Sequence, residues 1–370
     1  MTAVSLQAVA AIAVLVALFW AAPQQYRWPM LSLATIAFLS FAAPLSILLI
    51  GAVGATSYWV VRAKPSPLWR YAYAVVAFAV FLLLRAYGGG GFVWFGAAFY
   101  MLRALHVVLE GARSNAEAVS PLSYAHFLLF PPTFAVGPVD RYACFEREVH
   151  RHRWNPAPFS AGLETVLYGY VQVVLLANVL VGGYFRHYEL LMPQGSLRDW
   201  VECIDYGASL YFKFSGYSDI AIGVALLLGV RIPENFDRPY LARNVSDFWR
   251  RWHISVTSWC RDYVNMPVLA VTRHRGAAAV SAMVVLGLWH ELSPRYLLWG
   301  LFHGIGIAIW NGWRGLRARW PAATGLAAKL ETVFAWGVTM AFVTASFAIT
   351  KETTLWASWS ELASLVGVHV

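Results

Sequence analysis

The feature that most constrains the fold of this chain is a long run without charge, from Leu31 to Val61. It exceeds the ~20 apolar residues that one transmembrane helix requires. The composition agrees, because 59% of the residues are hydrophobic and only 13% are charged, against ~25% charged in typical soluble domains. Tryptophan and tyrosine favour membrane interfaces, and aromatic residues make up 16% of the chain. We therefore expect an integral membrane protein.

Apolar runs of helical length recur along the chain, and none alternates as a membrane β-strand would. They span residues 3–21, 31–61, 69–87, 92–110, 159–186, 205–230, 275–290, 295–313 and 331–350. The run at 31–61 fits one long tilted helix or two short ones. With a half-span at 121–138, the pattern predicts an all-α bundle of about 9–11 membrane segments, some short, tilted or re-entrant. Since no Lys or Arg precedes the first run, we expect a retained span there.

We find no internal repeat and no insertion of soluble-domain size, so we expect one membrane-embedded domain over residues 1–370. The net charge of +9 comes from basic residues in short loops. This distribution is typical of the positive-inside rule and does not indicate a nucleic-acid partner. The loops at 62–70, 141–153 and 314–319 are therefore predicted to face the cytoplasm, with 121–138 re-entrant.

Cysteine spacing and the common catalytic motifs argue against several classes of site. Cys144, Cys203 and Cys260 are dispersed, which implies neither a disulfide framework nor a metal site. An H-E-x-x-H zinc motif would need histidine at position 294, where Pro294 stands. Cys260, beside Arg261, is either an acyl-carrying thiolate or a small buried hydrophobic residue. We expect no metal and no bound cofactor.

The segment 121–138 contains four prolines, two of them adjacent. Proline removes a backbone donor and disfavours a helical residue before it, so a straight spanning helix is not expected. Broken backbone at membrane depth is tolerated where it is buried in protein or lines a wet cavity. The alternative is a kinked interfacial loop.

The segment around His253 reads as one amphipathic helix, capped at its start by Asn244 or Ser246. In such a helix Trp249, His253 and Thr257 share a face at i, i+4 and i+8. Arg250 then lies beside His253, where burial and a nearby positive charge both favour the neutral imidazole. The alternative is a basic helix on lipid phosphates with an incidental histidine.

His290 ends an apolar run and precedes Ser293-Pro294, the N-cap and first residue of the next helix. We expect it at a turn between two helices, walled by Trp289 and Trp299. A lone histidine at a helix end is usually structural. Two tryptophan-flanked histidines on either side of one hydrophobic stretch favour a functional site, because ionisable groups are costly there. His303 is expected to pack or to support the site.

Several short motifs follow one another in the second half of the chain. They are Phe214-Ser-Gly-Tyr-Ser-Asp219, Pro233-Glu-Asn-Phe236, Phe248-Trp-Arg-Arg-Trp-His-Ile-Ser255, Arg261-Asp-Tyr263, Gly287-Leu-Trp-His290 and Leu298-Trp-Gly-Leu-Phe-His-Gly304. Together with Phe130-Pro-Pro and Gly137-Pro-Val-Asp-Arg141, this order resembles the bacterial branch of the membrane-bound O-acyltransferase (MBOAT) family. That branch includes alginate O-acetyltransferases and teichoic-acid D-alanyl transfer proteins. The resemblance covers roughly residues 80–350.

The resemblance implies an O-acyltransferase with His290 as the catalytic histidine and His253 as its partner, within a tunnel through a helical bundle. The residues expected to support the site or bind substrate are Asp219, Asn235, Trp249, Arg250, Trp252, Trp289 and His303. The expected reaction moves an acyl group, acetyl above all, from a cytoplasmic thioester to a hydroxyl of an envelope polysaccharide. The alternatives are D-alanyl or other acyl transfer to a teichoic-acid-like polymer or lipid, and a non-catalytic transporter or assembly scaffold. The sequence departs from the family where Glu291 replaces the usual glycine.

The chemistry of such a transfer assigns roles to these side chains. A histidine suits the base that deprotonates the acceptor hydroxyl, and we expect His290 in that role. The oxyanion needs a preorganised donor, for which His253 or Arg250 is predicted. The co-substrate is expected to be an acyl-CoA or acyl-carrier-protein thioester, docked on Arg141, Arg147 and Arg151. The expected partners are the bilayer of the bacterial inner membrane, a carrier protein and a periplasmic or extracellular acyl-transfer protein.

Overall fold

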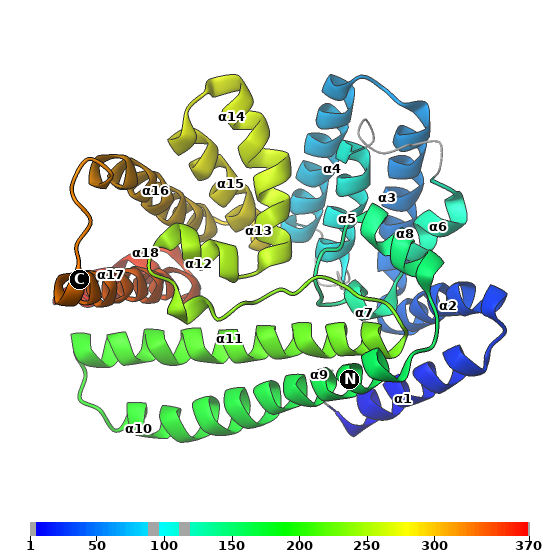
Figure 1. The fold of residues 1–370 in the computed structure, drawn as a ribbon, viewed down its shortest axis with the longest axis horizontal. Coiled ribbons are helices and arrows are strands. Elements are labelled where there is room, and N and C mark those ends of the chain that lie inside the picture. Colours follow the sequence, from blue (N-terminus) through cyan, green and yellow to red (C-terminus); the bar gives the residue numbers. More distant parts are fainter. Residues whose placement is uncertain (1–4, 88–95, 111–118, 369–370) are drawn as a thin grey trace. The chain divides into compact units, whose positions relative to one another are not determined.

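The computed structural model describes residues 5–87, 96–110 and 119–368. Within these ranges every regular element is a helix, so the all-α prediction is confirmed (Figure 1). By length and composition, four of the described helices are able to cross a membrane: Pro44–Ala63, Pro67–Tyr87, Pro156–Leu190 and Gly325–Lys351. All four fall on predicted apolar runs. The total of 9–11 membrane segments stays a prediction.

Contacts between Cα atoms divide the chain into two compact units. The first consists of Met1–Val171 and Gly216–Glu234, and the second of Gln172–Ser215 and Asn235–Val370. His253, His290 and His303 all belong to the second unit, so their mutual geometry is internal to it. The single-domain organisation stays a prediction.

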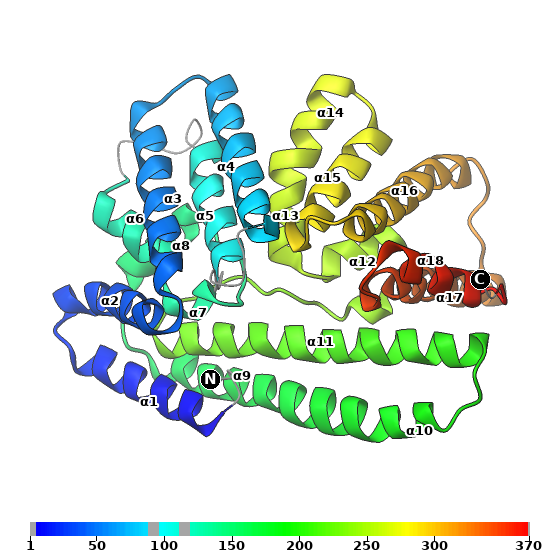
Figure 2. The same ribbon diagram turned by 180° about the vertical axis from the view of Figure 1, so that it is seen from behind.

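In the first unit, the run at 31–61 forms parts of two helices, α2 (Gln24–Ala42) and α3 (Pro44–Ala63). The break falls at Ala43, whose backbone is non-helical, because Pro44 disfavours the helical conformation in the residue before it. The helix α3 lies beside α5 (Ala97–Glu110), which also contacts α4 (Pro67–Tyr87) (Figure 2). The start of the run predicted at 92–110 lies outside the described residues.

The remaining helices of the first unit are short or frame its apolar core. They are α1 (Leu6–Ala21), α6 (Pro121–Leu128), α7 (Pro131–Phe134), α8 (Tyr142–Arg151) and α9 (Pro156–Tyr170), with the last turns of α11 (Ser196–Leu227). The prediction that 121–138 is broken is confirmed, because α6 ends before the adjacent prolines. Phe130 between α6 and α7 is extended.

The broken segment is held by a buried arginine that the sequence analysis did not single out. Arg103, on α5, donates from Nη2 to the carbonyl of Leu128 at 2.7 Å and from Nη1 to the carbonyl of Phe127 at 3.0 Å. Its Nη1 also donates to Thr133 Oγ1 at 2.6 Å. The guanidinium therefore satisfies carbonyls at the end of α6 that have no helical partner.

The second unit begins with the wide helical turns of η2 (Val171–Phe185), which continue α9, and with α10 (Arg186–Leu190) and the first part of α11. Its other helices are η3 (Pro239–Leu241), α12 (Val245–Arg251), α13 (Ile254–Cys260), η4 (Arg261–Asn265), α14 (Met266–Thr272), α15 (Arg275–His290), α16 (Pro294–Arg317), α17 (Gly325–Lys351) and α18 (Leu355–Ser364).

The helices α15 and α16 form a tightly packed hairpin (Figure 1). Glycines line the seam between them. A Cβ atom on Gly300 would lie 2.6 Å from the carbonyl oxygen of Met283, and one on Gly304 would lie 2.6 Å from the Cα of Val280. Small residues allow two helix backbones to approach closely. The seam therefore fixes how the residues of α15 face those of α16.

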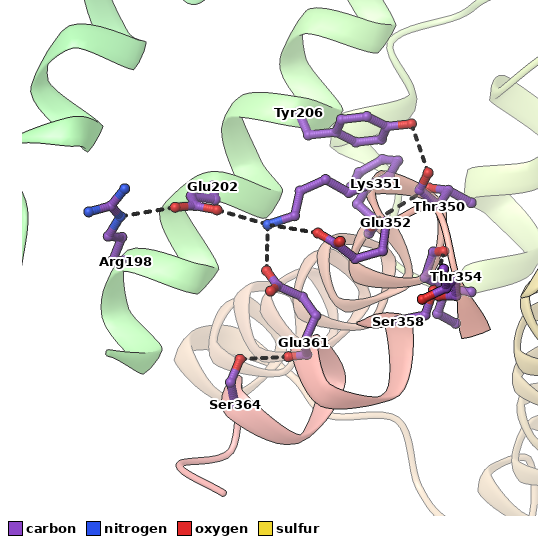
Figure 3. A network of polar contacts seen from close by, with 12 residues as sticks. Arg198, Glu202, Tyr206, Thr350, Lys351, Glu352, Thr354, Ser358, Glu361 and Ser364 are labelled. Carbon is purple, nitrogen blue, oxygen red and sulfur yellow. Dashed lines mark hydrogen bonds and ion pairs between the residues drawn. The ribbon is translucent and has the colours of Figure 1, made fainter. Parts of the chain in front are cut away.

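Ion pairs connect the end of α17 to α11 and α18 (Figure 3). Lys351 Nζ lies 2.8 Å from Glu202 Oε2 and 2.6 Å from Glu361 Oε1. Arg198 approaches the other oxygen of Glu202 at 2.9 Å. The neighbouring residue, Thr350, accepts a hydrogen bond from Tyr206 through its carbonyl oxygen. This network positions the last turns of α17, which line the site described next.

Candidate functional site

His290 is the last residue of α15, at the turn into α16, as predicted. Ser293 caps α16 through its side-chain oxygen, and Pro294 occupies the first turn. The His290 ring lies 4.9 Å from that of Trp289 and 5.8 Å from that of Trp299, measured between centroids. Both predicted tryptophan walls are therefore present.

The prediction of one continuous helix through His253 is wrong. The helix α12 ends at Arg251, and His253 adopts a left-handed backbone conformation, with φ of +48°, before α13 begins. The predicted stripe of Trp249, His253 and Thr257 on one helical face therefore does not exist. The predicted cap at Asn244 is confirmed, because its side chain accepts from the Asp247 amide at 2.8 Å.

The break at His253 is explained by Asn235, which lies 18 residues upstream. The Asn235 carbonyl accepts from the Ile254 amide at 2.9 Å. Its side-chain oxygen accepts from the amide and the hydroxyl of Ser255, at 3.2 and 2.9 Å. These bonds satisfy amides that α13 leaves unpaired at its start. They offset the cost of about 1–3 kcal/mol for a left-handed histidine.

The break brings the two predicted catalytic histidines together. The ring centroids of His253 and His290 are 6.3 Å apart. Phe214 lies edge-on to His253 at 4.5 Å, and Trp289 lies 5.9 Å from it. The His253 side chain is only 1% exposed, and burial lowers its pKa well below the ordinary value, with the charge of His290 adding to the shift. His253 is therefore neutral at neutral pH.

A third histidine, His303, is buried on α16. Trp249 donates from its indole Nε1 to Nδ1 of His303 at 3.2 Å. The ring of Trp299 packs against two histidines, with its centroid 4.9 Å from that of His303 and 5.8 Å from that of His290. Thus Trp249 and His303, both predicted to support the site, are in direct contact.

These side chains enclose a cavity of about 110 Å³. Its lining includes His290, His303, Trp249 and Trp299, with Trp252 and Phe214 from the neighbouring segments. Tyr206, Leu210, Phe248 and Tyr296 also line it. The end of α17 contributes four residues that were not predicted from the sequence: Val343, Ser346, Phe347 and Thr350. Nothing in the apolar pattern of 331–350 distinguishes these positions from lipid-facing ones. The cavity is therefore a small aromatic chamber with imidazoles in its wall.

The structure places Arg250 away from the His253 imidazole, contrary to the prediction. Its side chain is 74% exposed and pairs with Asp247 at 3.0 Å. It borders a second cleft of about 530 Å³, together with Arg261 and Arg314. Trp249 lines both this cleft and the histidine cavity.

Cys260 also lines the second cleft. Burial raises the pKa of its thiol to about 12. A thiol is a nucleophile only as the thiolate, so this favours the buried hydrophobic role over the acyl-carrying one. Among the described residues, no group of three or more histidines, cysteines and carboxylates is arranged to hold a metal ion.

The other predicted residues are distributed over both units. Trp252 stacks on Phe248 at 5.4 Å beside the cavity. Asp219 is on the part of α11 that belongs to the first unit. Arg141, Arg147 and Arg151 are at α8, also in the first unit. Arg141 is partly buried and lies 3.3 Å from His106 Nδ1, so these three arginines do not form one exposed patch.

Comparison with known proteins agrees with the order of motifs. The profile of the membrane-bound O-acyltransferase family matches residues 35–350. The chain is 30% identical over 312 residues to a probable alginate O-acetylase AlgI of Pseudomonas fluorescens, covering 79% of this chain and 62% of that protein. It is 27% identical over 231 residues to a teichoic acid D-alanyltransferase of Bacillus subtilis, covering 59% of this chain and 58% of that protein.

A peptidoglycan O-acetyltransferase of Helicobacter pylori is 26% identical over 258 residues, covering 67% of this chain and 47% of that protein. The chain thus spans less than two thirds of the length of each of these three relatives. The family match nevertheless covers most of the sequence and includes both histidine motifs. The chain belongs to the membrane-bound O-acyltransferase (MBOAT) family.

Proposed function

We propose that this protein transfers a small acyl group, acetyl above all, from a thioester to a hydroxyl of an envelope glycan in the bacterial inner membrane. The observation that supports this most is that the His290 and His253 rings lie 6.3 Å apart beside an aromatic cavity. Relatives named as alginate and peptidoglycan O-acetyltransferases favour a polysaccharide acceptor. The relative named as a teichoic acid D-alanyltransferase supports the alternative, D-alanyl transfer.

In the proposed reaction, His290 accepts the proton of the acceptor hydroxyl. The oxygen attacks the thioester carbonyl, a C–O bond forms, and the carbonyl electron pair moves onto oxygen. The pair then returns, the C–S bond breaks, and the thiolate takes the proton back from His290. No nucleophilic side chain is required, so the acyl group passes directly between donor and acceptor. The aromatic walls exclude the water that would hydrolyse the donor.

The size of the cavity limits the acyl group. At about 110 Å³ it is far smaller than the ~300–1,000 Å³ of ordinary ligand pockets, and large side chains surround it. A two- or three-carbon acyl group fits this space, whereas a long fatty acyl chain does not.

We therefore expect purified protein, given labelled thioesters of increasing chain length and an envelope glycan, to esterify the glycan with acetyl and propionyl groups. Octanoyl transfer is expected to be at least about tenfold slower, because overpacking costs ~1–3 kcal/mol. Scintillation counting of the glycan measures the ester. A transporter would move label without forming ester, and a scaffold would do neither.

The thioester donor requires a surface for its charged carrier. We propose that the second cleft receives a phosphorylated carrier arm such as that of coenzyme A. Arg250, Arg261 and Arg314 border this cleft, and its volume of about 530 Å³ is that of a small-molecule site. Trp249 lines both this cleft and the histidine cavity, which favours a donor whose phosphates contact the arginines and whose thioester is directed toward His290. Arg141, Arg147 and Arg151 at α8 stay the second candidate for donor docking.

A comparison of two triple variants distinguishes these donor surfaces. Replacing Arg250, Arg261 and Arg314 by glutamine is expected to raise the KM for acetyl-CoA by about tenfold at low salt, since exposed ion pairs contribute ~0.2–1 kcal/mol each. The same change at Arg141, Arg147 and Arg151 serves as the matched control of equal charge. If only the α8 variant raised the KM, the donor would dock at α8 and not at the second cleft.

A further inference from the structure

Of the three histidines His253, His290 and His303, two are held by partners whose chemistry fixes where the ring proton lies. The indole Nε1–H of tryptophan is only a donor. Since Trp249 Nε1 lies 3.2 Å from His303 Nδ1, that nitrogen must accept. An imidazole that accepts at Nδ1 is neutral and carries its proton on Nε2.

The partner of His253 imposes the opposite arrangement. The Asn235 side-chain atom facing His253 Nδ1 also receives the backbone amide of Ser255, at 3.2 Å. A backbone amide is only a donor, so this atom is the carboxamide oxygen rather than the nitrogen. His253 Nδ1 must therefore donate to it. In the neutral ring that burial favours, the lone pair of His253 is then on Nε2.

We infer that His303 is the hydrogen-bond donor to the oxyanion of the proposed acyl transfer, with Trp249 as the positioning residue that holds its tautomer. This deepens the proposed function and rests on it. His303 lines the same cavity as His290, and Trp299 contacts both rings. When the acceptor oxygen attacks, negative charge moves onto the thioester carbonyl oxygen, and a preorganised N–H donor stabilises it.

The same geometry argues against the two donors expected from the sequence. The Arg250 guanidinium pairs with Asp247 at the second cleft and does not line the histidine cavity. Neutral His253 offers its N–H to Asn235 and so presents an acceptor at its other nitrogen. Of these two histidines with an assigned tautomer, His303 carries its N–H on Nε2, the ring nitrogen that Trp249 does not contact.

The test measures the tautomers of His253 and His303 by NMR and the turnover of variants at His303 and Trp249. In protein labelled with ¹⁵N-histidine, NMR should show His303 protonated at Nε2 and His253 at Nδ1. The variant His303→Leu should lose about 10²–10³-fold in kcat with little change in the KM for acetyl-CoA. His303→Gln supplies an N–H near the position of Nε2 and should recover at least a tenth of the lost activity. Trp249→Phe removes the constraint and should give a mixed tautomer with lower kcat.

Trp336→Phe is the matched control. It also removes an indole hydrogen bond, to the carbonyl of Tyr240 at 2.8 Å, but Trp336 does not line the cavity. It should keep the wild-type tautomers and turnover. Protonation of His303 at Nδ1 in the wild type, or wild-type turnover by folded His303→Leu, would overturn the inference. Absence of ester formation by the wild type would instead refute the proposed function, because the NMR result does not depend on activity.

Discussion

Replacing His290 with alanine is expected to abolish acyl transfer, a loss of about 10³-fold or more, while the protein still reaches the membrane in normal amounts. General-base catalysis contributes ~10²–10⁴-fold. The residue ends α15 and caps no helix start, so its removal should affect chemistry more than packing. The measurement is transfer of labelled acetyl from acetyl-CoA to glycan, normalised to membrane protein.

His187→Ala is a suitable control for this variant, because His187 is an exposed histidine on α10 of the same unit. It should retain wild-type transfer. His253→Ala should show a large but incomplete loss, since water is able to replace part of a supporting role. Normal turnover by His290→Ala would remove His290 from the mechanism.

The second large effect is expected on stability, from one methyl group in the seam of α15 and α16. In Gly300→Ala the new Cβ would lie 2.6 Å from the Met283 carbonyl oxygen and 2.9 Å from the Val284 Cα. Both are backbone atoms that no side-chain rotation relieves, so the helices must separate. Overpacking of this kind costs ~1–3 kcal/mol. The separation should also move His290 relative to His303 and lower transfer.

Gly312→Ala provides the control on the same helix, because a Cβ there has no atom within 4 Å. Alanine is favoured over glycine in a helix by ~0.5–1 kcal/mol. The two identical substitutions should therefore change thermal stability in detergent in opposite directions. Equal melting temperatures for both variants would show that the seam is not tightly packed.

Local rules were enough to predict most helices and the place of His290. Pro44 separates α2 from α3, Ser293-Pro294 starts α16, and Asn244 starts α12. Each signal acts within a few residues, through a missing amide or a side-chain cap. The order of motifs likewise predicted that His253 and His290 belong to one site, and the structure brings them together.

The local course of the chain at His253 was not predictable in this way. The helical pattern continues through 244–263, but Asn235 satisfies the amides of the following turn from outside the segment. A contact over 18 residues therefore overrides the local periodicity. As a result Arg250 is in another cleft, and the support for His303 comes from Trp249, 54 residues away.

The proposed activity is tested most directly by the ester content of the cell envelope. Mass spectrometry should compare O-linked esters on envelope glycans from a strain lacking this protein, and from that strain carrying either the wild type or His290→Ala. We predict that one small acyl ester disappears with the deletion, returns with the wild type, and stays absent with His290→Ala at equal protein level. An ester profile that the deletion leaves unchanged, or that His290→Ala restores in full, would contradict this prediction.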